Sequence, residues 1–131
     1  MAQVKQVQFS DLNLTFNQHP VTGKLSVLKN NDAVKRSVRN IILTNHYERP
    51  YQPKFGGNIR AQLFEQLDGF TSSEIKDDIA TALANFEPRA EIYDIVVTPT
   101  SDENGFNVSI TFRVINQTDP ITVILFLERV R

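Results

Sequence analysis

Residues 106–114 read Phe-Asn-Val-Ser-Ile-Thr-Phe-Arg-Val, an unbroken alternation of apolar and polar side chains. Side chains of a β-strand point alternately to opposite faces, so this stretch predicts a strand with one buried and one solvated face. Such alternation is typical of an antiparallel sheet. The stretch decides the fold class, because its apolar face needs a covering layer that the rest of the chain must supply.

Two further strands flank this one in the sequence. Tyr93, Ile95 and Val97 alternate before it, and the turn-forming residues 101–105 between the two runs predict a hairpin. After a second turn, residues 121–127 predict a third strand. The C-terminal third of the chain is therefore expected to form an antiparallel meander.

The third predicted strand is unusual on its outward side. Ile124 and Phe126 occupy positions that normally carry polar residues in a strand that closes a small sheet. Two explanations are open at this point. Another element of the chain covers these side chains, or another chain adds a strand here and buries them.

Three predicted helices precede the strands and supply the covering layer. Apolar residues recur at helical spacing over 31–44, 58–67 and 71–87. Thr71 followed by Glu74 fits a capping box, and Pro88 ends the third helix. The predicted core-facing residues are Val34, Val38, Ile41, Ile42, Ile59, Leu63, Phe64, Leu67, Ile75, Ile79, Ala82, Leu83 and Phe86. This order predicts an α+β fold with about three helices on an antiparallel meander of three or more strands.

The composition is that of one small globular domain. The chain has 131 residues, of which 40% are apolar and 22% charged, and it contains no cysteine. We expect residues 1–131 to form a single domain, with residues 1–15 as a possible extended arm. Residues 1–60 carry nine Lys and Arg against three Asp and Glu, a net charge of +6, whereas residues 61–131 carry five against twelve, a net charge of −7.

Several classes of function find little support in the sequence. The two histidines, His19 and His46, lack the spacing of a metal site, and the cations are too dispersed for a nucleic-acid patch. No apolar run is long enough to span a membrane, and we expect synthesis in the cytoplasm. Glu65 and Glu87 could form a carboxylate pair for glycosidic chemistry, but the chain has no Trp and only three Tyr to stack on sugars. We therefore predict no catalytic residue, metal or cofactor.

The corner at residues 87–89, Glu-Pro-Arg, departs from local preference. Glu87 falls at the C-terminal end of the third predicted helix, where the helix dipole disfavours a carboxylate. Pro88 makes the chain rigid at this point, so we expect Glu87 and Arg89 to project from a fixed corner. Such an acid–base pair suits charge-assisted docking to a partner better than catalysis. The simpler explanation is a solvated local ion pair.

A second unusual segment is the connector at residues 49–57, between the first two predicted helices. Its characteristic residues are Arg49, Pro50, Pro53, Phe55 and Gly56. The two prolines predict an extended, rigid link, and we expect Tyr51 and Phe55 to pack against the core and hold it. Its simplest role is structural.

These segments together carry a family resemblance. The motifs are Glu87-Pro88-Arg89, the run Arg49-Pro50…Pro53-x-Phe55-Gly56 with Leu63-Phe64-Glu65 after it, and Phe16-x-x-His19-Pro20-x-Thr22-Gly23. At these spacings, and over about residues 10–127, the chain resembles the baseplate wedge family of contractile phage tails. That family includes sheath-initiator subunits and a baseplate component of type VI secretion systems, and some members have been labelled lysozyme-like.

The resemblance implies a structural subunit of a virion tail baseplate, present in six copies, without catalysis. It implies docking of Glu87, Pro88 and Arg89 on the helical core of the wedge, and growth of the tail sheath by strand addition to the β-sheet. Ile124 and Phe126 would then be the sheath-facing residues. The implied partners are other wedge proteins and the sheath protein, with no nucleic acid or membrane. The alternative function is a peptidoglycan-degrading tail enzyme, and the sequence leaves open whether the assembly is a phage tail, a pyocin or a secretion machine.

Overall fold

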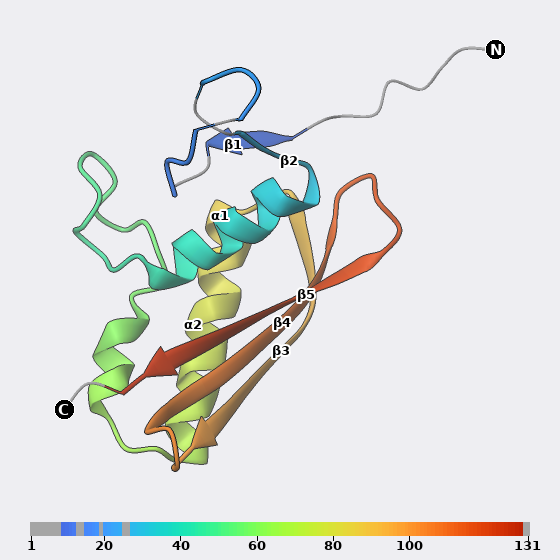
Figure 1. The fold of residues 1–131 in the computed structure, drawn as a ribbon. Coiled ribbons are helices and arrows are strands. Elements are labelled where there is room, and N and C mark those ends of the chain that lie inside the picture. Colours follow the sequence, from blue (N-terminus) through green and yellow to red (C-terminus); the bar gives the residue numbers. More distant parts are fainter. Residues whose placement is uncertain (1–8, 13–14, 19, 25–26, 130–131) are drawn as a thin grey trace.

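Three long antiparallel strands form the main sheet, in the order β3–β4–β5 (Figure 1). In this computed structural model the described residues are 9–12, 15–18, 20–24 and 27–129. The strands are β3 (Ala90–Thr100), β4 (Gly105–Val114) and β5 (Pro120–Glu128). The central strand β4 contains the alternating stretch, and its apolar residues are buried as predicted. The meander predicted from the sequence is confirmed.

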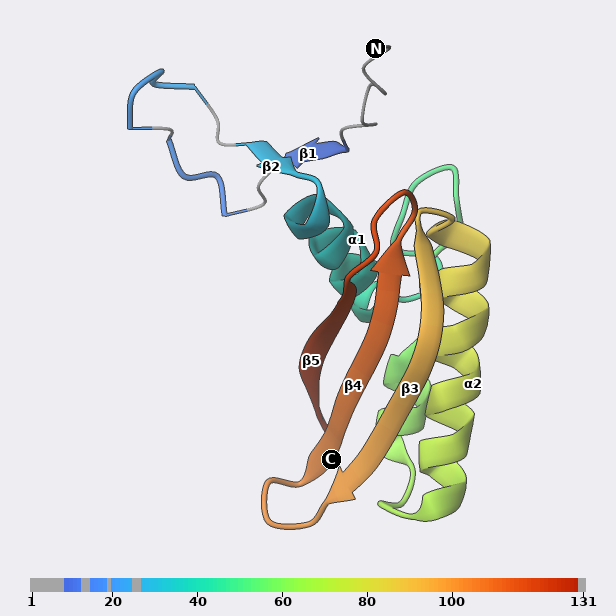
Figure 2. The same cartoon turned by 90° about the vertical axis from the view of Figure 1, so that its right-hand side faces the viewer.

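Two α-helices and one 3-10 helix cover a single face of this sheet. They are α1 (Asn31–Leu43), η1 (Ile59–Phe64) and α2 (Gly69–Phe86). Figure 2 shows α2 lying along the sheet on one side, while no helix of the described residues lies on the opposite side. The predicted α+β class is thereby confirmed. No helix among the described residues is long and apolar enough to cross a bilayer.

One hydrophobic core lies between the helices and the sheet. Burial there is the main stabilising term, at roughly 25 cal/mol per Å² of apolar surface removed from water. Its members are Val34, Val38, Ile41, Ile42, Ile59, Leu63, Ile75, Ile79, Ala82, Leu83, Ile95, Phe106, Val108, Ile110, Phe112, Val114, Ile121, Leu125 and Leu127.

The start of α2 differs from the predicted capping box. Its N-cap is Asp68, whose carboxylate Oδ1 accepts a hydrogen bond of 2.8 Å from the Thr71 backbone N–H. This bond from Thr71 is the largest cause that lowers the pKa of Asp68 below its ordinary value. Aspartate is a better N-cap than threonine, so Asp68 takes this position and Thr71 lies inside the helix.

Two aromatic residues expected in the core lie outside it. Phe64 is 56% exposed, because the segment folds as a short 3-10 helix, whose tighter winding directs Phe64 away from the stripe of Ile59 and Leu63. Tyr93 is 53% exposed. A bulge between Ile92 and Asp94 shifts the register of β3, so Tyr93 leaves the alternation that places Ile95 in the core.

The N-terminal part forms a separate two-stranded sheet. β1 (Ser10–Leu12) pairs antiparallel with β2 (Val27–Lys29) above the start of α1 (Figure 1). Only part of the arm predicted for residues 1–15 lies within the described residues, and there it contains β1. His19 lies outside the described residues.

The connector packs on α1 and α2 through its last residues. Phe55 is partly buried, as predicted, whereas Tyr51 is fully exposed, because its positive φ of 67° turns it outward at the tip of the loop. Gly56 has a φ of +104°, and a Cβ there would lie 2.3 Å from the Thr44 carbonyl oxygen. Glycine is therefore required where the connector passes the end of α1.

We predict that Gly56→Ala lowers the free energy of unfolding by about 2–4 kcal/mol, because it combines left-handed strain with a backbone clash. Gly69→Ala is the control, since a Cβ at this helix start meets nothing within 4 Å. Urea unfolding of both variants measures the difference. Equal stability of the two variants would contradict this account of Gly56.

Candidate functional site

The corner at residues 87–89 is built around a buried carboxylate. Helix α2 ends at Phe86, and the Glu87 backbone N–H still donates to the Leu83 carbonyl. The Glu87 residue is only 2% exposed. The prediction that Glu87 projects from the corner is therefore wrong, and so is the simpler explanation of a solvated pair. Of the three residues, Pro88 is exposed and Arg89 is half-buried.

Arg89 binds this carboxylate through two parallel hydrogen bonds. Its Nε donates to Glu87 Oε1 at 2.7 Å and its Nη2 to Oε2 at 3.0 Å. The Arg89 backbone N–H also approaches Oε1, at 3.4 Å. A bidentate pair of this kind fixes direction as well as distance, so the guanidinium has one orientation relative to the end of α2.

The environment keeps Glu87 ionised. Burial alone would raise the pKa of the carboxyl. Hydrogen bonds from Arg89 and from the Ser37 side chain of α1 act in the opposite direction, as does the positive charge of Arg89. Together they outweigh burial and hold the pKa of Glu87 below its usual value. The same hydrogen bond with Glu87 raises the pKa of Arg89. The pair is a permanent one at neutral pH.

Arg89 also connects the corner to the N-terminal sheet. Its Nη2 lies 3.5 Å from Asp11 Oδ2 of β1, and its guanidinium stands over the Phe9 ring with 5.4 Å between Cζ and the ring centroid. The pair of Glu87 and Arg89 thus links the end of α2 with α1, through Ser37, and with β1, through Asp11. Sequence reasoning missed Asp11 and Ser37 as members of this site, although a serine within the apolar stripe of α1 is a local signal for a buried polar contact.

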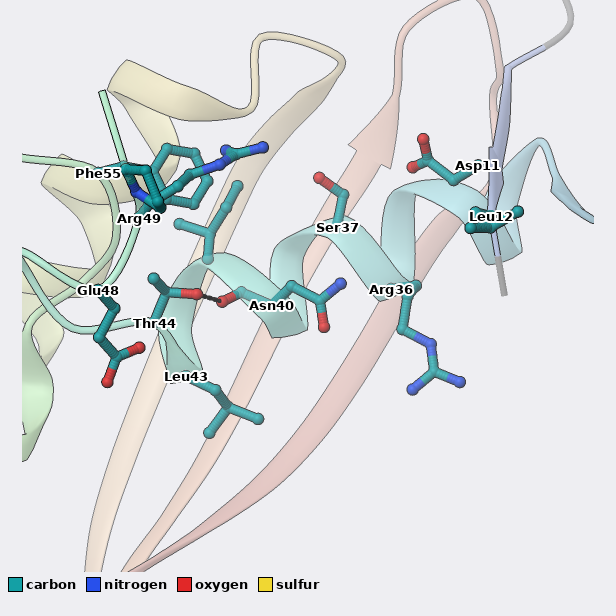
Figure 3. Close-up of a pocket in the computed structure, with 12 residues that line it drawn as sticks. Asp11, Leu12, Arg36, Ser37, Asn40, Leu43, Thr44, Glu48, Arg49 and Phe55 are labelled. Carbon is teal, nitrogen blue, oxygen red and sulfur yellow. Dashed lines mark hydrogen bonds between the residues drawn. The ribbon is translucent and has the colours of Figure 1, made fainter. Parts of the chain in front are cut away.

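A groove of about 600 Å³ runs along α1 next to this corner (Figure 3). β1 forms one end, the connector forms the other, and the outer side of α1 forms the floor between them. The lining residues are Asp11, Leu12, Arg36, Ser37, Asn40, Ile41, Leu43, Thr44, Glu48, Arg49, Pro50 and Phe55.

An aromatic stack fixes the connector end of the groove. Arg49 lies over the Phe55 ring, 4.4 Å from its centroid, and Phe55 packs at a tilt on Phe86, with 4.8 Å between centroids. Phe86 directly precedes the corner. The connector and the corner, which the sequence presented as separate motifs, are therefore neighbours in space.

The second candidate surface is the outward side of β5. Ile124 is 73% exposed and Phe126 is 43% exposed, so no element among the described residues covers them. Phe126 partly rests on Gly105 of β4, where an added Cβ would lie 2.5 Å from its ring. The sequence left two explanations for these outward apolar side chains. The first, that another element of the chain covers them, does not hold within the described residues.

The two edges of the main sheet differ in their ability to accept another strand. On β3, the bulge near Tyr93 disrupts the edge, Pro99 has no N–H, and the Ile95 N–H is bonded to its neighbour Asp94 at 2.9 Å. The pairing of β5 with β4 has no register shift, and its one proline is the first residue, Pro120. The edge of β5 therefore carries fewer features that hinder strand pairing than the edge of β3.

Catalytic and metal chemistry receive no support from these side chains. A glycosidic acid needs a raised pKa, whereas that of Glu87 is lowered and its carboxylate is bound to Arg89. Glu65, its nominated partner, is exposed. Within the described ranges, no cluster of three or more potential metal ligands occurs.

Comparison with known proteins gives a consistent result. The family described as baseplate wedge protein gp25 matches residues 29–119. The chain is 35% identical over 89 residues to baseplate wedge protein gp25 of Enterobacteria phage T4, which covers 68% of this chain and 67% of that protein.

Two solved structures are similar in fold. A chain of the six-fold symmetrised baseplate of the anti-feeding prophage has a TM-score of 0.74 and 25% identity, over 86% of this chain and 90% of that chain. A Geobacter sulfurreducens protein provisionally named a tail lysozyme has a TM-score of 0.69 and 24% identity, over 75% and 89% of the two chains.

We predict that Glu87→Gln costs about 2–3 kcal/mol of stability at neutral pH, because it leaves Arg89 without its buried counter-charge. The folded-state pKa of Glu87 lies below its ordinary value of 4.5, so its ionised form stabilises the fold above that pH, and this contribution is lost as pH falls through the lower value. Urea unfolding across this pH range should show that the difference in unfolding free energy between variant and wild type becomes smaller in acid. A difference in unfolding free energy that does not depend on pH would contradict the conclusion that ionised Glu87 stabilises the fold.

Proposed function

Because the chain belongs to the baseplate wedge protein gp25 family and is a structural component of a contractile-tail baseplate, we propose that it docks on the wedge core through its corner and starts the sheath through β5. On this proposal it has no catalytic residue and no cofactor. Residues 1–131 act as one wedge domain, assembled in the host cytoplasm into the tail of the virion. Its partners are other wedge proteins and the sheath protein, and it binds neither nucleic acid nor membrane.

The docking role is supported by the meeting of two distant motifs. The connector and the corner carry much of the family resemblance, and they join through Phe55 and Phe86. Glu87 is the internal anchor of this site, while Pro88 and the outer side of Arg89 are available for contact. This convergence on one rigid surface is the observation that carries the docking proposal.

The sheath role is supported by the edge and the open face of β5. An incoming strand could pair with its unblocked edge and place apolar residues beside Ile124 and Phe126. The likeness to a subunit of a six-fold baseplate supports six copies of this chain in each assembly. Six such edges would form a ring from which the first sheath layer grows.

The docking role can be tested with the double variant Glu87→Gln/Arg89→Met. Because it removes both charges together, it leaves neither buried ion unpaired, and we expect the fold to survive. Capture of the neighbouring wedge proteins from a co-expression lysate should be lost. Circular dichroism melting checks folding, and full capture by a folded variant would refute docking at the corner.

The sheath role can be tested with Ile124→Lys, which charges a side chain that is already 73% exposed and should leave stability nearly unchanged. We expect baseplates to form but sheath to be absent in electron micrographs. Val96→Lys is the matched control, because Val96 on β3 flanks the same residue, Ser109, from the other side. Equal loss of sheath in both variants would contradict a specific role for the β5 edge.

A further inference from the structure

We infer that the loop between α1 and η1 presents Tyr47 and Tyr51 as two preformed aromatic anchors, and that they enter an apolar pocket on a neighbouring wedge protein. The inference rests on the proposed docking role and adds a second contact beside the corner at residues 87–89. Figure 1 shows this loop, which contains the connector, standing away from the sheet at the end of α1.

Both tyrosines are open to solvent. Tyr47 is 84% exposed and Tyr51 is fully exposed. They belong to the loop tip, residues 47–54, in which every residue is exposed and Pro50 and Pro53 add apolar surface. A tyrosine ring buries a large area on binding and loses little conformational freedom, which is why tyrosine is enriched at protein interfaces.

Each tyrosine occupies a backbone position that glycine ordinarily fills. Hydrogen bonds from the fourth N–H to the first carbonyl close two turns, residues 45–48 at 3.4 Å and residues 49–52 at 3.3 Å. In both turns only the third residue, Tyr47 or Tyr51, has a positive φ, and its value is 67°. This is the pattern of a type II turn, which favours glycine at the third position. A bulky side chain there is strained, and such strain concentrates at functional sites.

The rest of the loop holds both turns in place. The Tyr47 N–H donates to the Pro53 carbonyl at 2.7 Å and so joins one turn to the end of the other. The Arg49 guanidinium lies over the Phe55 ring, which in turn packs on Phe86 of α2. The backbone that carries the two tyrosines is therefore ordered before any partner binds, which lowers the entropy cost of binding.

The position of the loop tip favours a wedge protein as the partner. The contact of Phe55 with Phe86 connects the loop to the corner, because Phe86 directly precedes Glu87. A protein that docks on the corner therefore comes close to the loop tip as well. The match to the baseplate wedge family, residues 29–119, includes both segments.

The chemistry of the loop tip favours an apolar pocket. Its three charged residues are Glu48, Arg49 and Lys54. The Glu48 carboxylate is bound to the Asn45 side chain at 2.7 Å, and Arg49 lies over Phe55. One engaged and one open cation are few for binding nucleic acid or an anionic membrane. Two aromatic rings beside two prolines suit an apolar pocket with hydrogen-bond acceptors for the phenol hydroxyls.

The test measures binding of the intact chain to the purified core complex of the wedge by biolayer interferometry. Tyr51→Gly should bind about ten- to thirtyfold more weakly, because it truncates an aromatic anchor. Its melting temperature should be equal to or above that of the wild type, since glycine is favoured at this turn position. Tyr51→Phe keeps the ring and should bind nearly as well as the wild type. Phe70→Ala is the control, because it removes an exposed ring at the opposite end of α2 from the corner and should not change binding.

Unchanged binding by Tyr51→Gly would overturn the inference, and so would an equal loss of binding in Phe70→Ala. Binding of the wild type to phosphatidylglycerol vesicles or to single-stranded DNA that is lost in Tyr51→Gly would assign the tyrosines to another class of partner, which also overturns it.

The double variant Glu87→Gln/Arg89→Met in the same assay separates this inference from the docking role of the corner. If the double variant loses binding and Tyr51→Gly does not, the anchors are refuted and docking at the corner stands. If Tyr51→Gly alone loses binding, docking at the corner is refuted and the anchors stand. No binding by the wild type would refute both.

Discussion

The buried ion pair of Glu87 and Arg89 is the constraint on which the site depends. A carboxylate that is 2% exposed is tolerable only when its oxygens are bonded, and here Arg89 and Ser37 supply those bonds. The pair lies where α2 turns into β3, and it reaches α1 through Ser37 and β1 through Asp11. The relative positions of four elements are therefore coupled to the geometry of one ion pair.

The two candidate surfaces occupy different parts of the molecule and use different physics. The groove and corner combine fixed charges with a rigid aromatic stack, which suits orientation-specific docking. The β5 side offers backbone hydrogen-bonding groups and exposed apolar side chains, which suit the addition of a strand. Under the proposed function, a subunit held by one surface and extended by the other would join a finished wedge to a growing sheath.

The elements that the sequence predicted well are those with long, regular periods. The stripes of α1 and α2 and the alternation of β4 persist over enough residues that burial of one face dominates. The errors of the sequence-based prediction occur where a single local irregularity interrupts a regular period. One bulge moved Tyr93 outward, one 3-10 turn exposed Phe64, and one positive φ turned Tyr51 away from the core.

By itself the sequence determined the α+β class, the outward position of Ile124 and Phe126 and the motifs of the corner and connector, because periodicity and proline act on neighbouring residues. The burial of Glu87, and the contacts of the corner with the connector and with β1, depend on the tertiary structure. The reason is sequence separation: Asp11 and Arg89 are 78 residues apart, and no local pattern encodes which distant side chains will satisfy a buried charge.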